Sequence, residues 1–273
     1  MEENNVDQME AAYREELAKY EEVLDATMDL SMNQHGIQTD GRGLRAMKVF
    51  TRQTLVAISL SKLLPFSRKT NDPEDGFWDV CSVASLTRNL MEGYVTLFYS
   101  GTEVVGEEEA ELRFFLGQYH RNREWQQIRK QQTPNDPEIA RIEERLANEM
   151  KRLKEHPFLL RLSPAQRNKV LKGDEIYLTK ADIEERSPVV GNYRLHYQIL
   201  SNLIHALPLS IERIGNDRGR GVRAGPDIAY ICLCLSLAVR FLAASVLAVY
   251  DRFPELGGRL AERPVKLRRF IAE

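Results

Sequence analysis

The chain has 273 residues, of which 43% are hydrophobic and 29% are charged, so it is long and apolar enough to bury a large core. Its formal net charge of −2 excludes a global attraction to nucleic acid or to an anionic membrane and leaves only local basic patches. Three cysteines in apolar surroundings (Cys81, Cys232 and Cys234) and an acidic N-terminal segment without a signal-peptide pattern predict buried thiols in a reducing compartment, and hence a cytoplasmic protein.

The first hundred residues have helical periodicity, and no segment of the chain predicts a strand. Apolar side chains recur every three or four residues over 6–32, which predicts a long amphipathic helix. A second helix is expected over 44–64, where Pro65 ends it, and a third over about 77–101.

The composition then changes to two charge-rich segments, 107–132 and 137–156, each with a narrow apolar stripe. The turn sequence TPNDP separates them, so they predict an antiparallel hairpin of solvated helices. We interpret residues 106–156 as an inserted hairpin and residues 157–190 as an irregular connection with short helices. The expected fold is therefore a single all-α domain over 1–273, a helical bundle with an inserted charged hairpin.

The C-terminal part predicts helices over 192–207, 228–250 and 255–271. The middle one is apolar throughout and matches the roughly 20 residues that cross a bilayer. Arg240 lies near its centre, where a charge costs roughly 2.5–3.5 kcal/mol in a membrane. A core helix covered by the others is the preferred interpretation, and a membrane anchor through 228–250 is the less favoured alternative.

The helix over 192–207 carries a polar stripe, because Tyr197, Ser201 and His205 are spaced four residues apart. Histidine is the side chain best suited to proton transfer near neutral pH, and Ser201 is within reach as a hydrogen-bond partner. The alternative is a polar seam in a helical core, in which a histidine near a helix end bonds a backbone carbonyl.

The helix over 77–101 contains a second polar pair, Arg88 and Glu92, in an otherwise apolar run. Charges in such a position are rarely buried unless they are paired. In a functional site, Arg88 would hold an anion or phosphate and Glu92 would orient His205. As a structural pair they would fix the register of the bundle, and Arg240 could neutralise Glu92 instead.

These two helices also carry a resemblance. The segments SVASLTRNLMEGYVTLFY and YQILSNLIH resemble a group of uncharacterised bacterial helical proteins with an Arg-x-x-x-Glu helix and a later Tyr-x-x-Leu-Ser-x-x-x-His helix. That group is similar to the HEPN superfamily (higher eukaryotes and prokaryotes nucleotide-binding). The resemblance covers about 77–101 and 192–250. It implies a HEPN-like bundle of the kind common in toxin and phage-defence systems, with RNA or a nucleotide as ligand and a homodimer as the assembly.

One feature of HEPN ribonucleases does not match. They carry an arginine followed four to six residues later by a histidine on one helix. Here Arg194 precedes His205 by eleven residues and His196 by two, so neither pair fits. Metal-independent RNA cleavage would therefore need a site rebuilt across helices from Arg88 and His205.

A basic, glycine-rich loop follows the polar helix. Its arginines are Arg213, Arg218, Arg220 and Arg223. Guanidinium groups suit phosphate oxygens and glycines permit close backbone approach, so the loop predicts phosphate or RNA binding. The alternative is a mobile, solvated connection.

Two hypotheses remain open, and the sequence does not decide whether the protein is an enzyme. In the first, a possible ribonuclease, His205 is the acid/base with Ser201 as its candidate hydrogen-bond partner, Arg88 and the loop arginines stabilise phosphate charge, and Glu92 and Tyr197 position the groups. In the second, a non-enzymatic scaffold or partner-binding protein, Arg88, Glu92, Tyr197 and His205 form a structural network. No metal or cofactor motif occurs, so neither a metal site nor a cofactor is expected.

Overall fold

The computed structural model describes residues 2–69, 76–187, 189, 191–205, 207–215, 218–256 and 266–271. These residues form helices and contain no strand, apart from an isolated bridge between Trp78 and Gly221, so the predicted all-α fold is confirmed. The chain divides into two compact units. The first combines Met1–Thr102 with Glu184–Glu273, and the second is Glu103–Ile183.

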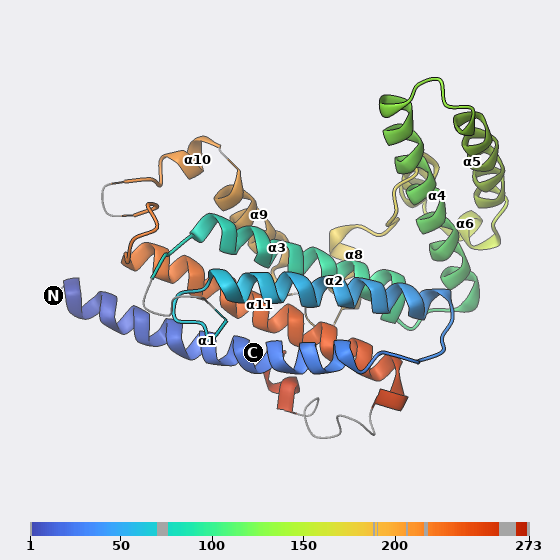
Figure 1. The fold of residues 1–273 in the computed structure, drawn as a ribbon. Helices are drawn as coiled ribbons and strands as arrows, with labels where there is room; N and C mark the ends of the chain where they lie inside the picture. The colour runs from blue at the N-terminus through green and yellow to red at the C-terminus, as the bar shows by residue number, and fades with distance from the viewer. Residues whose placement is uncertain are drawn as a thin grey trace. The chain divides into compact units, whose positions relative to one another are not determined.

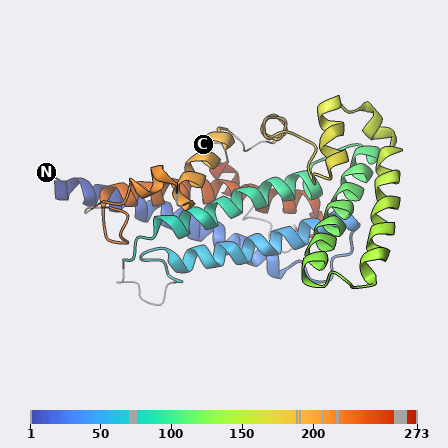
Figure 2. The same ribbon diagram turned by 90° about the horizontal axis from the view of Figure 1, so that it is seen from above.

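Five helices of at least three turns build the first unit (Figure 1). They are α1 (Glu2–Met32), α2 (Gly41–Leu63), α3 (Val80–Leu97), α9 (Tyr193–Ile204) and α11 (Gly225–Arg252). Helices α1, α3 and α11 run in the same direction, and α2 and α9 run opposite to them. Seen from above, α3 lies between α2 and α9 (Figure 2), so side chains on two of its faces meet different helices. The shorter elements of this unit are η1 (Phe98–Thr102), α10 (Pro208–Ile211), η2 (Pro254–Leu256) and η3 (Arg268–Phe270).

Helix α11 is the core helix of the first unit, because it packs along α1 and α3 and most of its side chains are buried. Among the described residues it is the one helix long and apolar enough to cross a membrane. However, 72% of its most apolar window is buried by the protein itself. A helix that is apolar on all sides and enclosed by others is typical of a protein core.

Helix α1 contributes two fully buried tyrosines to the same core. The hydroxyl of Tyr13 donates to the carbonyl of Pro65 at 2.7 Å, and that of Tyr20 donates to the carbonyl of Ala57 at 2.7 Å. Burial raises the pKa of both phenols, which stay protonated as donors. The aromatic rings thus fill the core, while one hydroxyl bonds a carbonyl within α2 and the other bonds the carbonyl of Pro65 just after it.

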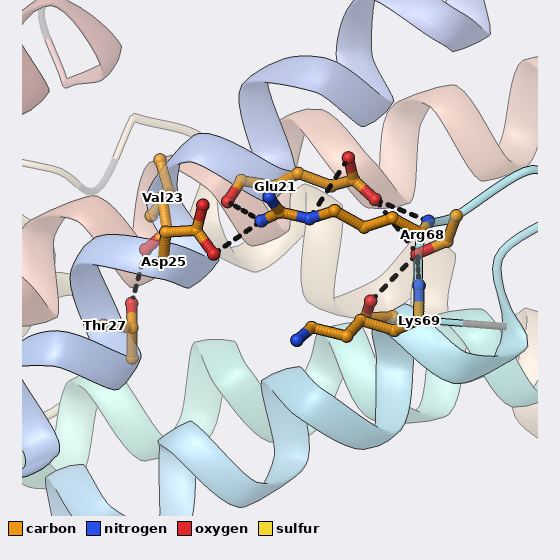
Figure 3. Close-up of polar contacts among 8 residues, drawn as sticks. Glu21, Val23, Asp25, Thr27, Arg68 and Lys69 are labelled. Atoms are coloured by element: carbon orange, nitrogen blue, oxygen red, sulfur yellow. Dashed lines mark hydrogen bonds and ion pairs between the residues drawn. The ribbon is translucent and has the colours of Figure 1, made fainter.

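The segment that follows α2 is bound to α1 by Arg68 (Figure 3). Its Nη2 donates to Asp25 Oδ1 at 2.5 Å and to the carbonyl of Glu21 at 3.1 Å, and its backbone N–H donates to Glu21 Oε1 at 2.9 Å. Hydrogen bonding to Asp25 raises the pKa of Arg68. These bonds fix the exit of α2 against α1.

The second unit contains the charge-rich helices. They are α4 (Glu107–Gln132), α5 (Glu138–Lys154), α6 (Pro157–Arg161) and α7 (Pro164–Lys172), with α8 (Lys180–Arg186) crossing the boundary between the units. Helices α4 and α5 pack against each other, and an ion pair of 2.7 Å between Arg129 and Asp136 closes their turn. These two helices lie in the segment expected to form the hairpin. The interpretation of the chain as one domain, with an insertion at 106–156 and a connection over 157–190, stays a prediction.

A buried ion network lies within the second unit. Arg113 is 2% exposed, and its Nη1 donates to Glu103 Oε2 at 2.6 Å while its Nη2 donates to Glu109. The hydroxyl of Tyr177 donates to Glu109 Oε1 at 2.5 Å. The network joins the start of α4 to the segment between α7 and α8. Its buried charges are tolerated because each arginine or glutamate is paired with an opposite charge.

One expectation from the sequence is wrong. Cys81 is exposed and not buried, because it lies at the start of α3 on the side that faces a pocket. Most of the expected helix over 255–271 lies outside the described residues, and the 3-10 helices η2 and η3 lie near the two ends of that segment.

Candidate functional site

Helices α3 and α9 place the predicted site residues on facing surfaces. Helix α3 begins at an N-cap, where the side chain of Asp79 accepts from the N–H of Ser82 at 3.0 Å, and it buries the face that contains Val83 and Leu90. Arg88 and Glu92 lie on the side turned to α9, which packs along α3. Because α9 runs opposite to α3, Tyr197 and His205 come to lie near Arg88.

The guanidinium of Arg88 contacts three of the predicted residues. Its Nε donates to Glu92 Oε1 at 2.9 Å, its Nη2 donates to the hydroxyl of Tyr197, and its Nη1 lies 3.4 Å from Nε2 of His205. Its central carbon also stands 4.3 Å from the ring centroid of Tyr197, in cation–π geometry. Four of the five predicted catalytic residues therefore form one polar cluster, in which the Arg88 side chain is 19% exposed.

The contact between Arg88 and His205 requires a particular form of the imidazole. A guanidinium has no acceptor, so it can only donate in this bond, and Nε2 of His205 must accept. In the tautomer that makes this bond, the proton of the imidazole lies on Nδ1. An imidazole in this state is a base, and the atom that would take a proton is the one that faces Arg88.

His205 ends α9 and is exposed. Its backbone is extended, with φ −94° and ψ 140°, and its carbonyl accepts from the N–H of Leu207 at 2.7 Å and from the hydroxyl of Ser210. The helix is thus shorter than the predicted 192–207, because these local bonds turn the chain before Pro208. The bend directs the chain into α10 and places His205 at the edge of a pocket.

Ser201 is not part of the polar cluster. Its hydroxyl donates to the carbonyl of Tyr197 at 2.8 Å, one turn back along α9. A serine that bonds its own helix in this way has used its donor on the backbone. The contact of Ser201 with His205 is through the backbone, where the N–H of His205 donates to the carbonyl of Ser201 at 3.3 Å, so its predicted role as a side-chain partner of the imidazole stays a prediction.

The pocket beside His205 has a volume of about 280 Å³ and is bordered by α3, α9, α10, α11 and the basic loop. Its lining residues are Val80, Cys81, Leu203, Ile204, His205, Ser210, Ile211, Arg213, Ile214, Arg218, Gly219, Pro226, Asp227 and Tyr230. The guanidinium of Arg213 lies 4.9 Å from the ring centroid of Tyr230. Two of the four predicted phosphate-binding arginines, Arg213 and Arg218, therefore border the same space as His205.

The other two loop arginines lie elsewhere. Arg223 pairs with Asp7 and, at 2.6 Å, with Glu10, so it joins the loop to α1. Arg220 is exposed and does not line the pocket. The loop is held in shape at Gly219, whose φ of +74° suits glycine and whose N–H donates to the buried Asp227 at 2.7 Å. The arginines thus do not form one continuous patch.

A match to one protein family covers residues 47–221. This is more than half of the chain, and it includes α3 and α9 with the whole polar cluster. The chain belongs to the DUF5677 family. The description of DUF5677 is "family of unknown function", so membership assigns no reaction. Comparisons with curated proteins and with solved structures find no match. The resemblance to the HEPN superfamily therefore stays a prediction.

The DUF5677 match also includes Gln53 of α2, a polar residue that sequence reasoning missed. Gln53 is 2% exposed, and its Nε2 donates to Ser245 Oγ at 3.0 Å and to the carbonyl of Leu90 at 3.3 Å. It lines a smaller space of about 170 Å³ together with Glu92. The signal that could have identified it is its spacing from Phe50 and Ala57, because a residue three or four positions from both lies on the buried face of α2.

His196 and Arg240 form a further pair of neighbours that the sequence did not connect. Burial, followed by the charge of Arg240, lowers the pKa of His196 below its usual range, with Glu184 acting in the opposite direction. Arg240 was considered as a partner of Glu92, whereas the ion pair of Glu92 is with Arg88. In the described residues no three His, Cys, Asp or Glu side chains gather in a way that could hold a metal.

Proposed function

We propose that this member of the DUF5677 family is a HEPN-like protein that acts on RNA or on a nucleotide phosphate in the cytoplasm. The polar cluster of Arg88, Glu92, Tyr197 and His205 would be its reaction centre. The observation that carries the proposal is the position of one guanidinium in contact with all three partners, one of which, His205, lines a pocket with two more arginines. A toxin or phage-defence role and a homodimer follow from the resemblance alone.

In this proposal an entering phosphate takes the place of His205 as the acceptor for Arg88. Bonds from a guanidinium to a phosphate oxygen are stronger than a neutral bond to an imidazole, so the exchange is favourable. It frees Nε2 of His205 to remove the proton from a ribose 2′-hydroxyl. That oxygen then attacks phosphorus, the bond to the 5′-oxygen breaks, and the leaving oxygen takes a proton from the imidazolium. Arg88 stabilises the charge that develops on phosphate, and Glu92 keeps Arg88 in place.

The substitution His205→Gln tests this centre. Loss of an acid/base group lowers rates by about 100- to 10,000-fold, so we expect the variant to lose cleavage of labelled single-stranded RNA or of a nucleotide by at least the lower figure. His35→Gln makes the same chemical change at an exposed histidine outside the cluster and should leave the rate unchanged. A folded His205→Gln protein that cleaves at the rate of the parent contradicts the assignment.

The second candidate function is a non-enzymatic scaffold or partner-binding protein. Its specific support is that the polar groups are engaged within the protein: Arg88 bonds three side chains and Ser201 bonds its own helix. In that case the parent protein leaves RNA and nucleotides intact, and His205→Gln lowers only the melting temperature. A membrane anchor through α11 is the least favoured possibility, and recovery of the protein without detergent would contradict it.

A further inference from the structure

The pocket beside His205 offers an apolar space of limited size. Most of its lining surface is apolar, and it includes five aliphatic side chains from α3, α9, α10 and the loop: Val80, Leu203, Ile204, Ile211 and Ile214. Its volume of about 280 Å³ is close to the lower end of ligand pockets, which run from about 300 Å³ upward. An apolar ring system that leaves water for this space gains free energy from the hydrophobic effect.

One side chain that lines this pocket has a polar atom without a partner. Nη1 of Arg213 is buried and donates to no acceptor in the described part of the chain. The same guanidinium is held against the ring of Tyr230, which fixes its plane. A buried N–H without an acceptor is unfavourable, and an arginine fork matches the two oxygens of a carboxylate or phosphate. Arg213 is therefore a donor prepared for an anionic acceptor.

The remaining charges of the pocket agree with an anionic ligand. Arg218 is exposed at its rim and forms no ion pair with another described residue. The opposite charge of Asp227 is already engaged, because its Oδ2 accepts the N–H of Gly219 and so holds the loop. The loop therefore contributes two arginines, Arg213 and Arg218, to the lining of the pocket, while the carboxylate of Asp227 accepts from a backbone N–H.

We infer that this pocket binds a small organic anion with an apolar ring system, whose carboxylate or phosphate is held by Arg213. The ring lies among the aliphatic side chains and the head group accepts from the guanidinium of Arg213. Binding needs no proton transfer at His205, so the inference goes beyond the proposed function and does not depend on it.

Matched ligands of one ring system test the inference by calorimetric titration: naphthalene-1-carboxylate, 1-naphthyl phosphate and the neutral naphthalene-1-carboxamide. We expect the parent protein to bind one or both anions at least about tenfold more tightly than the amide, because a charge-assisted bond in a site with little water is worth about that factor. The tighter of the two anions identifies the head group.

The variant Arg213→Met keeps an apolar side chain of similar length and removes the donor. It should bind the anions and the amide equally, whereas Arg194→Met, which removes an exposed arginine from α9 away from the pocket, should retain the preference. Equal binding of anion and amide by the parent, no binding of any of the three, or a preference that survives in Arg213→Met would each overturn the inference. An unchanged His205→Gln affinity alongside lost cleavage separates this site from the reaction centre.

Discussion

Tyr94 of α3 shows how burial controls the protonation of a single side chain. It is 1% exposed, and its hydroxyl shares a hydrogen bond of 2.7 Å with Ser187 Oγ. Burial raises the pKa of Tyr94 to about 12, since the charged phenolate would lose its hydration. The neutral phenol, by contrast, packs against Phe98 and Phe241.

This raised pKa predicts how stability depends on alkaline pH. In the unfolded chain Tyr94 ionises near pH 10, so its contribution is complete below that pH and is lost as the pH rises towards 12. The loss amounts to at most about 3 kcal/mol. We expect the difference in melting temperature between the parent and Tyr94→Phe to be constant at pH 8–9 and to shift in favour of the variant from pH 10 to 12. Parallel curves over the whole range would contradict this role of the phenol.

At the scale of elements, the π-helical turn η1 approaches α2 very closely. A Cβ atom at Gly101 would lie 2.7 Å from Cβ of Ala46 and 3.0 Å from its Cα. Both residues are buried, and the backbone atoms of α2 cannot move away as a flexible side chain could. Glycine is therefore needed at this crossing for space.

Gly101→Ala should destabilise the first unit by about 1–3 kcal/mol, the usual effect of forcing an extra methyl group into a packed core. The measurement is the melting temperature, with the exposed Gly191→Ala as the matched control, because a Cβ there meets nothing within 4 Å. An unchanged melting temperature for Gly101→Ala would show that α2 and η1 can separate freely.

Periodicity in the sequence predicted the long helices well, and it predicted contacts between them poorly. The helical spacing of apolar residues in α1 and α2, and the continuous apolar run in α11, mark where each helix extends along the chain. These helices therefore lie close to their expected bounds. The end of α9 depends on carbonyl bonds from Leu207 and Ser210, which have no periodic signal. The four-residue spacing placed Tyr197 and His205 on one face, but their meeting with Arg88 depends on how α3 and α9 pack. The pairing of Arg223 with α1 is likewise a tertiary contact that composition does not reveal.

At the scale of the whole molecule, the two units are stabilised by different interactions. The first is organised around the apolar helix α11, whereas the second is a smaller, charge-rich unit that contains the buried Arg113 network. A smaller unit buries a smaller fraction of its surface and depends more on individual interactions.

Arg113→Met should therefore destabilise the second unit selectively. Removal of one partner from a buried ion network leaves Glu103 and Glu109 uncompensated, which costs about 3–5 kcal/mol. Hydrogen exchange of amides in α4 should accelerate, while exchange in α11 stays unchanged. Arg141→Met removes an arginine whose side chain is 80% exposed and should alter neither helix. Equal acceleration in α4 and α11 would show that the two units unfold together.

The packing of α1 along α11 has a consequence for the order of folding. The ribosome makes α1 before α11, yet the two helices pack along each other. Contacts between such distant segments require a large loop to close, which slows folding. Helix α2 covers part of α1 earlier, but the side of α1 that packs on α11 stays without its native cover until α11 is made, and the nascent chain is exposed to aggregation during that interval.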